Sequence, residues 1–294
     1  MGKTVYKKLK GSQCLRQRLI LSTLASSPLL IEDIRAEDTW PGLRPHEVSL
    51  LRLLEKVCDD CVVEINETGT KLRYKPGTVM GGKNIVHDCG VSRSIGYFLE
   101  PLILVALFGK KPLSIRLKES RGAPPHGGGE VILTVPTVEK LMAVNWLDEG
   151  MLRGLEALPS LPECLLNVHI FTDHKAGPQA GKSPGYGISL VAETTSGCFI
   201  LLIVQFLMHK EKLIEQGGVV DSTHQGLLFL LCALSEPDVS KIRVGKLSAY
   251  GIETLRSIID FLSVKFDIKP DPSTGTVILR GMGCGYKNLS RKAS

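Results

Sequence analysis

Apolar residues recur along this chain at the spacings of helices that each bury one face. Between residues 44 and 57, Val48, Leu51, Leu54 and Val57 lie three residues apart, so they share one side of a helix. Other segments are apolar on most sides, as in core helices. The predicted helices cover residues 44–57, 94–108, 224–234 and 249–266, and the third begins after the cap residues Asp221-Ser222-Thr223.

Short apolar segments rich in β-branched residues alternate with these helices and are bounded by turn residues. The predicted strands cover residues 27–36, 62–65, 71–74, 113–117, 130–135 and 276–280. The turn Glu67-Thr68-Gly69-Thr70 joins the second strand to the third. Recurring strand-helix-strand-strand units predict an α/β fold.

Composition narrows the class of protein. With 294 residues and 43% hydrophobic content, the chain can bury one large core or two modest ones. Its formal net charge of +6 suits an acidic partner such as RNA. The apolar runs 97–108, 198–208 and 227–234 are too short to span a bilayer, so we expect a soluble intracellular protein with no membrane partner.

The eight cysteines are scattered, mostly within apolar runs, as expected for reduced core thiols. Cys58-Asp59-Asp60-Cys61 is the only CxxC sequence, and a zinc site would need a second pair of ligands. We therefore expect no metal site, and we interpret this segment as the exposed end of the helix that begins near His46.

The most specific sequence is Arg121-Gly-Ala-Pro-Pro-His-Gly-Gly-Gly-Glu-Val131. Its two prolines fix a turn, and Gly127, Gly128 and Gly129 allow the backbone to approach a bulky or charged group. It is not a phosphate loop of the GxxxxGK[ST] kind, since no Lys-Ser/Thr and no helix follow. A strand follows instead.

As a whole, this string resembles the signature of the RNA 3'-terminal phosphate cyclase family. Further segments resemble family motifs in the family's order, namely 34–35 with 41–46, 69–77, 88–96 and 181–194. The resemblance implies three repeats, each with two helices on a four-stranded sheet, and a small inserted α/β domain. It predicts repeats 1 and 2 in residues 1–145, with the second shortened, a truncated insert in 146–200 and repeat 3 in 201–294.

Two catalytic positions of that family are changed. The nucleophilic histidine is replaced by Asp221, and His224 stands where the family has an aspartate. The glutamate of the family's N-terminal loop is replaced by Leu9. The chain thus resembles the non-catalytic eukaryotic branch. The resemblance implies a non-enzymatic factor of the nucleus and nucleolus for small-subunit (18S) rRNA processing. It also implies binding to pre-ribosomal RNA, a ribosome-assembly GTPase and small-subunit processome proteins, and no cofactor.

Basic residues inside the family motifs are the candidate anion-binding groups, because the planar guanidinium suits phosphate oxygens. The predicted phosphate-binding cleft comprises Gln13, Arg16, Arg35, Arg44, Arg93, Gly127, Gly128 and Gly129. The lysines and arginine near the C-terminus, Lys287, Arg291 and Lys292, are interpreted as a solvated tail.

The chain is also shorter than the family pattern. A strand, a helix and a strand are expected after Lys118, the insert lacks its first strand and helix between Gly150 and Asn167, and the segment after Gly197 is compressed. Loss of a helix predicts exposed apolar strands. Three alternatives stay open: an ATP-dependent RNA 3'-phosphate cyclase, a pre-rRNA endonuclease using Glu130, Asp221 and Glu193, and a non-functional truncated copy.

Overall fold

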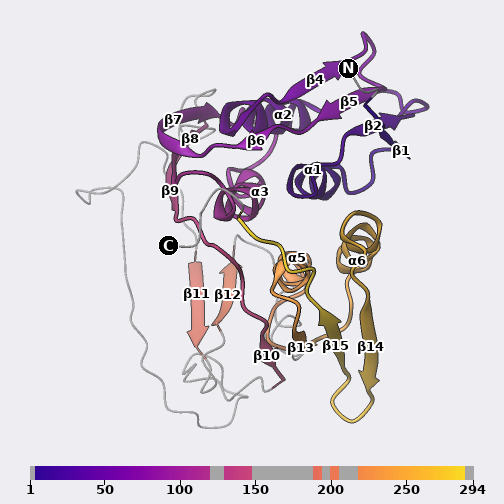
Figure 1. The fold of residues 1–294 in the computed structure, drawn as a ribbon, viewed down its shortest axis with the longest axis vertical. Coiled ribbons are helices and arrows are strands. Elements are labelled where there is room, and N and C mark those ends of the chain that lie inside the picture. Colours follow the sequence, from indigo (N-terminus) through magenta and orange to yellow (C-terminus); the bar gives the residue numbers. More distant parts are fainter. Residues whose placement is uncertain (1–3, 120–128, 148–187, 194–198, 205–217, 289–294) are drawn as a thin grey trace. The chain divides into compact units, whose positions relative to one another are not determined.

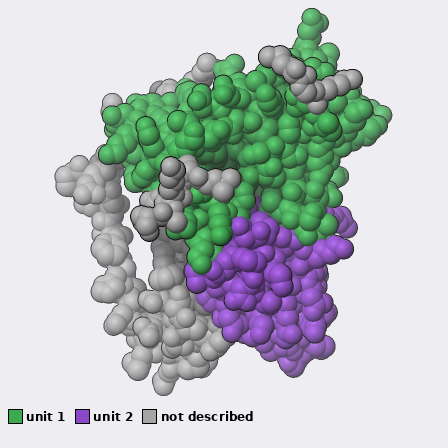
Figure 2. All heavy atoms as spheres, in the orientation of Figure 1, with its two compact units in different colours: residues 1–141, 257–263, 286–294 green, residues 142–256, 264–285 purple. Residues whose placement is uncertain are grey.

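The computed structural model describes residues 4–119, 129–147, 188–193, 199–204 and 218–288. The chain divides into two compact units (Figure 2). Unit one contains residues 1–141, 257–263 and 286–294, and unit two contains residues 142–256 and 264–285. The predicted domain boundaries at residues 145 and 200 remain a prediction, since much of the predicted insert lies outside the described residues.

Unit one begins with a complete repeat of four strands and two helices (Figure 1). Its elements are β1 (Lys7–Lys10), α1 (Leu15–Leu24), β2 (Leu29–Glu32), α2 (Pro45–Val57), β4 (Val62–Ile65) and β5 (Leu72–Lys75). The sheet order is β1-β2-β5-β4, with β1 parallel to β2 and the other two pairings antiparallel. The short strands β3 (Cys58–Asp59) and β6 (Thr78–Val79) pair beside it.

Alternation along β2 and β5 directs Leu29, Ile31, Leu72 and Tyr74 to one face, where all four are fully buried. The apolar sides of α1 and α2 join them in one core cluster. The buried Tyr74 hydroxyl is satisfied by the Thr23 hydroxyl of α1 at 2.7 Å.

The second repeat is incomplete. It consists of β7 (Gly82–Asp88), α3 (Gly96–Leu107), β8 (Leu113–Lys118) and β9 (Glu130–Val135), with sheet order β7-β8-β9. As in the first repeat, the first two strands are parallel and the next pair is antiparallel. Residues 119–129 alone join β8 to β9, where the first repeat has α2 and β4. The described part of this repeat therefore lacks one helix and one edge strand.

The missing helix leaves less apolar surface exposed than the sequence predicts. Leu113, Ile115 and Leu117 of β8 are each at most 1% exposed. They share one core with the first repeat, since α1 contacts α3 and α2 contacts β7. On β9, Val131, which is on the same face as these residues, is 37% exposed. Ile132 on the opposite face of the sheet is 59% exposed. The prediction of exposed apolar strands is wrong for β8 and correct for β9.

Unit two contains a sheet with the same pattern as the first repeat. Its elements are β10 (Asn145–Trp146), α5 (Gln225–Leu234), β13 (Val239–Val244), α6 (Ala249–Leu262), whose last residues belong to unit one, β14 (Phe266–Asp271) and β15 (Thr276–Met282). The order β10-β13-β15-β14 repeats one parallel and two antiparallel pairings. A separate antiparallel pair consists of β11 (Ile188–Glu193) and β12 (Phe199–Val204). The α/β prediction is confirmed.

Several predicted bounds are wrong for local reasons. The strand predicted over 27–36 ends at Glu32, because Asp33 and Arg35 have φ of 57° and 47°. The helix predicted to Phe266 ends at Leu262, and Phe266 begins β14. The helix predicted from His224 begins at Gln225.

The strand predicted over 276–280 continues through Met282 as β15. Cys58 was expected at an exposed helix end but is only 7% exposed, because β3 continues directly from α2. Burial raises the pKa of its thiol to about 12, so the thiol is protonated at neutral pH.

Candidate functional site

Two glycines fix the start of α2. Gly42 has a φ of 84°, and a Cβ there would lie 2.3 Å from the Thr68 carbonyl oxygen, so only glycine fits. The next backbone N–H, of Leu43, donates to the Gly69 carbonyl at 3.1 Å. The motif that begins α2 and the hairpin that joins β4 to β5 are therefore in contact. This contact sets the position of Arg44.

Arg35 is committed to an internal ion pair. Its guanidinium donates to both carboxylate oxygens of Glu47 at 2.7 and 2.8 Å, and Glu47 also accepts the Arg44 backbone N–H at 2.7 Å. The bond to Glu47 raises the pKa of Arg35. Glu47 is 4% exposed, so this pair anchors the loop to α2. The Arg35 charge is largely neutralised.

Arg16 of α1 is held against α3. Its guanidinium pairs with Glu100, donates to the Tyr97 carbonyl at 3.1 Å, and lies 5.0 Å from the centre of the Tyr97 ring. About a sixth of each charged side chain is exposed. Arg16 therefore links the two repeats, and its charge is also compensated.

Arg44 and Arg93 are the more accessible cations. Arg44 donates to Asp38 at 3.1 Å and to the Trp40 carbonyl, with a third of its side chain exposed. Arg93 is exposed and makes no hydrogen bond or ion pair with any described residue. It lies in the loop before α3. Both guanidinium groups can therefore reach a ligand in solution.

The four arginines surround one aromatic pair. The rings of His46 and Tyr97 meet edge to face with centroids 5.1 Å apart. Burial lowers the pKa of His46, the nearby Glu47 opposes this, and the charges of Arg93, Arg35 and Arg44 lower it further. We call Arg16, Arg35, Arg44 and Arg93 the arginine cluster. The structure thus brings together four of the predicted site residues.

The remaining predicted residues contribute less here. Gln13 is exposed in the turn before α1. Gly127 and Gly128 lie outside the described residues. Gly129 lies next to Ile95 at the start of α3, but a Cβ would be 3.7 Å from its nearest neighbour, an ordinary contact. Within the described part of the chain, no group crowds this glycine, and its role in approaching a ligand stays a prediction.

Asp221 and His224 form a local pair in unit two. The Asp221 carboxylate accepts hydrogen bonds from the backbone N–H groups of Thr223 and His224 and lies 2.7 Å from His224 Nδ1. Burial alone would raise the pKa of Asp221, but the bonds from His224 and Thr223 outweigh burial and lower the pKa to about 2. An ionised carboxylate therefore stands where the family resemblance predicts the nucleophile. Leu9, in β1, packs against the core and supplies no polar group.

The carboxylates considered for a nuclease are engaged individually or not described. Glu130 bridges Arg116 at 2.5 Å and Lys118 at 3.7 Å. Asp221 is held by His224, and the Glu193 side chain lies outside the described part. Among the described residues no three His, Cys, Asp or Glu side chains are grouped so that they could hold a metal ion. No helix in the described part of the chain is long and apolar enough to cross a membrane.

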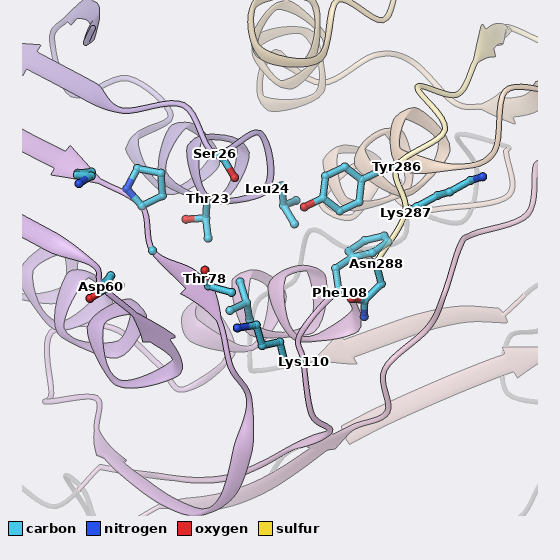
Figure 3. Close-up of a pocket in the computed structure, with 14 residues that line it drawn as sticks. Thr23, Leu24, Ser26, Asp60, Thr78, Phe108, Lys110, Tyr286, Lys287 and Asn288 are labelled. Atoms are coloured by element: carbon cyan, nitrogen blue, oxygen red, sulfur yellow. The ribbon is translucent and has the colours of Figure 1, made fainter. Parts of the chain in front are cut away.

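Unit one also has a basic hollow that was not predicted from the sequence (Figure 3). Its volume is about 510 Å³, and Lys75, Lys110 and Lys287 line it together with one carboxylate, Asp60. Figure 3 shows the Tyr286 hydroxyl pointing into the hollow, whereas Lys287 extends away from it. The lysines come from β5, the turn between α3 and β8, and the C-terminal segment. Because they are far apart in sequence, no local spacing could reveal them.

Comparison with known proteins places these features in a family. Residues 7–119 and 118–268 match the family described as RNA 3'-terminal phosphate cyclase. A probable RNA 3'-terminal phosphate cyclase-like protein of Arabidopsis thaliana is 52% identical, covering 98% of this chain and 99% of the relative. The human RNA 3'-terminal phosphate cyclase-like protein is 35% identical, with 96% of both chains covered. The rRNA processing protein rcl1 of Schizosaccharomyces pombe is 30% identical, over 97% of this chain and 98% of its own.

The same comparisons locate part of the shortening. The Arabidopsis alignment spans 374 positions against 294 residues, so at least 80 positions have no residue of this chain. The two family matches meet at residues 118–119, directly after β8. Compared with the first repeat, the described part of the second lacks one helix and one strand at this point. The sequence analysis expects one helix and two strands to be missing, so the observed loss is smaller by one strand. The other two predicted shortenings lie mostly outside the described residues. By sequence match and by topology, the chain belongs to the RNA 3'-terminal phosphate cyclase family.

Proposed function

We propose that this chain is a non-enzymatic rRNA processing factor that binds pre-ribosomal RNA through the arginine cluster. The names of its relatives support a role in rRNA processing, since one of them is called an rRNA processing protein. The main evidence for RNA binding at this site is the pair of accessible guanidinium groups of Arg44 and Arg93. They lie beside the rings of His46 and Tyr97. Cations that contact phosphates next to aromatic rings are a common arrangement for binding single-stranded RNA.

The four arginines of the cluster have two different roles, which follow from the groups that they contact. Arg16 and Arg35 are neutralised by Glu100 and Glu47, so they hold the cluster in place. Arg44 and Arg93 supply the charge that RNA phosphates neutralise. This division is the reason to test the second pair for binding and to treat the first pair as structural.

The binding test compares an Arg44→Ala/Arg93→Ala double variant with Arg73→Ala. Arg73 of β5 is also an exposed arginine of unit one, paired at 2.9 Å with Glu64 of the edge strand β4. With single-stranded pre-rRNA fragments, we expect the double variant to bind on the order of tenfold more weakly and to lower the salt dependence by about two ions. The control should match the parent chain.

Equal weakening by both variants would show that the contact is only general electrostatic attraction. Weakening by Lys75→Ala/Lys110→Ala instead of the arginine variant would move the contact to the basic hollow.

We propose that the chain carries out no nucleotidyl transfer and needs no cofactor. The family's reaction requires a histidine that accepts AMP, and Asp221 is an ionised carboxylate at neutral pH. Incubation with ATP labelled in the α-phosphate should leave no covalent AMP on the chain. A labelled chain whose label is lost in Asp221→Asn would contradict the proposal.

We further propose that the chain acts in the nucleolus, within the small-subunit processome, together with a ribosome-assembly GTPase. These steps rest on the family resemblance. Affinity purification of the tagged chain from its own cells should recover small-subunit precursor RNA and such a GTPase. Recovery of chaperones alone would support a non-functional truncated copy.

A further inference from the structure

The outer edge of β9 has no partner strand among the described residues, although its counterparts in the other sheets do. In the first repeat β5 is flanked by β4, and in unit two β15 is flanked by β14. β9 holds the same place in its sheet, antiparallel to the second strand, but ends the sheet. This edge arises from the shortening of the second repeat.

The register shows which backbone groups face outward. The Glu119 N–H donates to the Gly129 carbonyl at 2.9 Å, so residue 129 points its backbone groups toward β8. Because this direction alternates along an antiparallel strand, residues 131, 133 and 135 also face β8. Glu130, Ile132 and Thr134 then direct their backbone N–H and C=O groups to the open edge. No described residue forms a hydrogen bond with these backbone groups.

We propose that this edge pairs with the same edge of a second copy of the chain, antiparallel about a two-fold axis at Ile132. This register places Ile132 opposite Ile132, Val131 opposite Leu133, and Glu130 opposite Thr134. Each outward N–H then meets an outward carbonyl. No like charges oppose each other, and Glu130 is already paired with Arg116 within its own chain.

The complete sheets show what the missing strand must provide. In the first repeat, β4 places Ile65 opposite the buried Leu72, and in unit two β14 places Ile268 opposite the buried Leu279. The second copy does the same, because it places an apolar residue opposite Val131 and Leu133 of β9. Each copy thus supplies the neighbour that the other lacks, and the exposed Ile132 is covered. A two-fold contact of this kind closes on itself and does not extend into fibres.

Proline and lysine at position 132 test the pairing separately. Ile132→Pro removes an outward N–H while leaving every bond to β8, a position where edge strands tolerate proline. Ile132→Lys places two like charges opposite each other. By analytical ultracentrifugation over a concentration series, the parent chain should show a monomer–dimer equilibrium, and both variants should be monomeric with an unchanged circular dichroism spectrum.

Val86→Lys is the matched control. Val86 is 48% exposed and lies on the same face of the same sheet, across Arg116 from Ile132, but on β7 at the opposite edge. The control should dimerise like the parent. Cysteine substitutions test the predicted register. Residues opposite each other at the two-fold axis are close enough for a disulfide. Ile132→Cys should therefore cross-link two copies under mild oxidation, and Val86→Cys should not.

Three results would overturn the proposal. One is a parent chain that does not dimerise at the highest concentration tested. A chain whose β9 edge pairs with a strand of another protein, and not with a second copy, counts as the same result. Another is a dimer that persists in both Ile132 variants. The third is equal loss of the dimer in the Val86 control. None of these measurements involves RNA, so their failure would leave the proposed function untouched.

Discussion

The first and second repeats of unit one bury the same kind of strand face with different numbers of helices. In the first, α1 and α2 cover Leu29, Ile31, Leu72 and Tyr74, and β4 closes the edge. In the second, α3 is the only helix among the described residues, and β9 is at the edge of the sheet. Yet the inner face of β8 is as well buried as that of β2.

The difference shows which losses a neighbour can offset. A core face can be covered from the side, and α1 and α2 of the first repeat do so through their contacts with α3 and β7. A strand edge needs a partner in the plane of its own sheet, because backbone hydrogen bonds lie in that plane. Therefore the missing helix is compensated within unit one, whereas the missing strand is not.

The largest expected effect comes from removing the largest buried side chain of α3, the described helix of the second repeat. Phe98 of α3 is fully buried and lies against His87, with ring centroids 5.9 Å apart. Phe98→Ala should lower the free energy of unfolding by about 3–5 kcal/mol, because the surrounding core relaxes only partly into the cavity. Chemical denaturation measures the change, and Val91→Ala, at a residue 55% exposed, should stay near the parent. A cost below about 1 kcal/mol would mean that the second repeat does not depend on α3.

The next effect separates structural from ligand-binding arginines. The Arg35–Glu47 pair occurs in the loop and helix that have no counterpart in the described part of the second repeat. Arg35→Ala leaves the Glu47 carboxylate buried and without its cation, which should cost about 3 kcal/mol. Arg93→Ala removes an exposed cation and should change stability by less than about 0.5 kcal/mol. Equal costs in thermal or chemical unfolding would contradict the assignment of separate roles within the arginine cluster.

The contact between the repeats should also depend on pH through His87. This buried side chain of β7 meets the Ser49 hydroxyl of α2 at 3.0 Å, and its Nδ1 has no hydrogen-bond partner among the described residues. Burial lowers the pKa of His87 to about 4, and Lys56 and Arg52 add to this while Asp88 opposes it. Between pH 6.5 and 4 the unfolded chain binds a proton that the folded chain does not, so stability falls as the pH falls.

The full size of this pH effect is about 3 kcal/mol, since one unit of pKa corresponds to about 1.4 kcal/mol. His87→Gln keeps a donor for Ser49 but cannot titrate. Unfolding measured at pH 7.5 and pH 4.5 should therefore differ less in the variant than in the parent. An unchanged difference would assign the acid sensitivity to other groups.

The elements predicted correctly from the sequence are those with one side in the core and the other side facing water. The α2 stripe was readable because its polar side faces water, and the strand 130–135 was found with its observed bounds. α1 was missed because it is buried on most sides: Leu19, Ile20 and Leu21 are all fully buried, so no stripe marks it. β13 and β14, which the sequence analysis did not predict, include charged or polar residues among the apolar ones.

The arginine cluster was found residue by residue through the family motifs, but the partners of its members were not. No spacing rule indicates that Glu100, on α3, neutralises Arg16, because the two residues meet only through the packing of two helices. The lysines of the basic hollow were missed for the same reason. Local sequence thus identified candidate cations, and tertiary contacts determined which of them remain accessible.

The smallest expected effect compares one substitution at equivalent positions of the two repeats. Leu72 of β5 pairs with Ile31 of β2, and Leu133 of β9 pairs with Ile115 of β8. Among the described strands, only Leu72 also has a neighbour on its other side. Leu72 is fully buried, and Leu133 is partly exposed. Leucine to alanine should therefore cost about 1–2 kcal/mol more at Leu72. Both variants should be made in the Ile132→Lys background, so that no second copy covers Leu133. Equal costs would show that the open edge leaves β9 as well packed as β5, and the contrast between the two repeats would then lie in their hydrogen bonds alone.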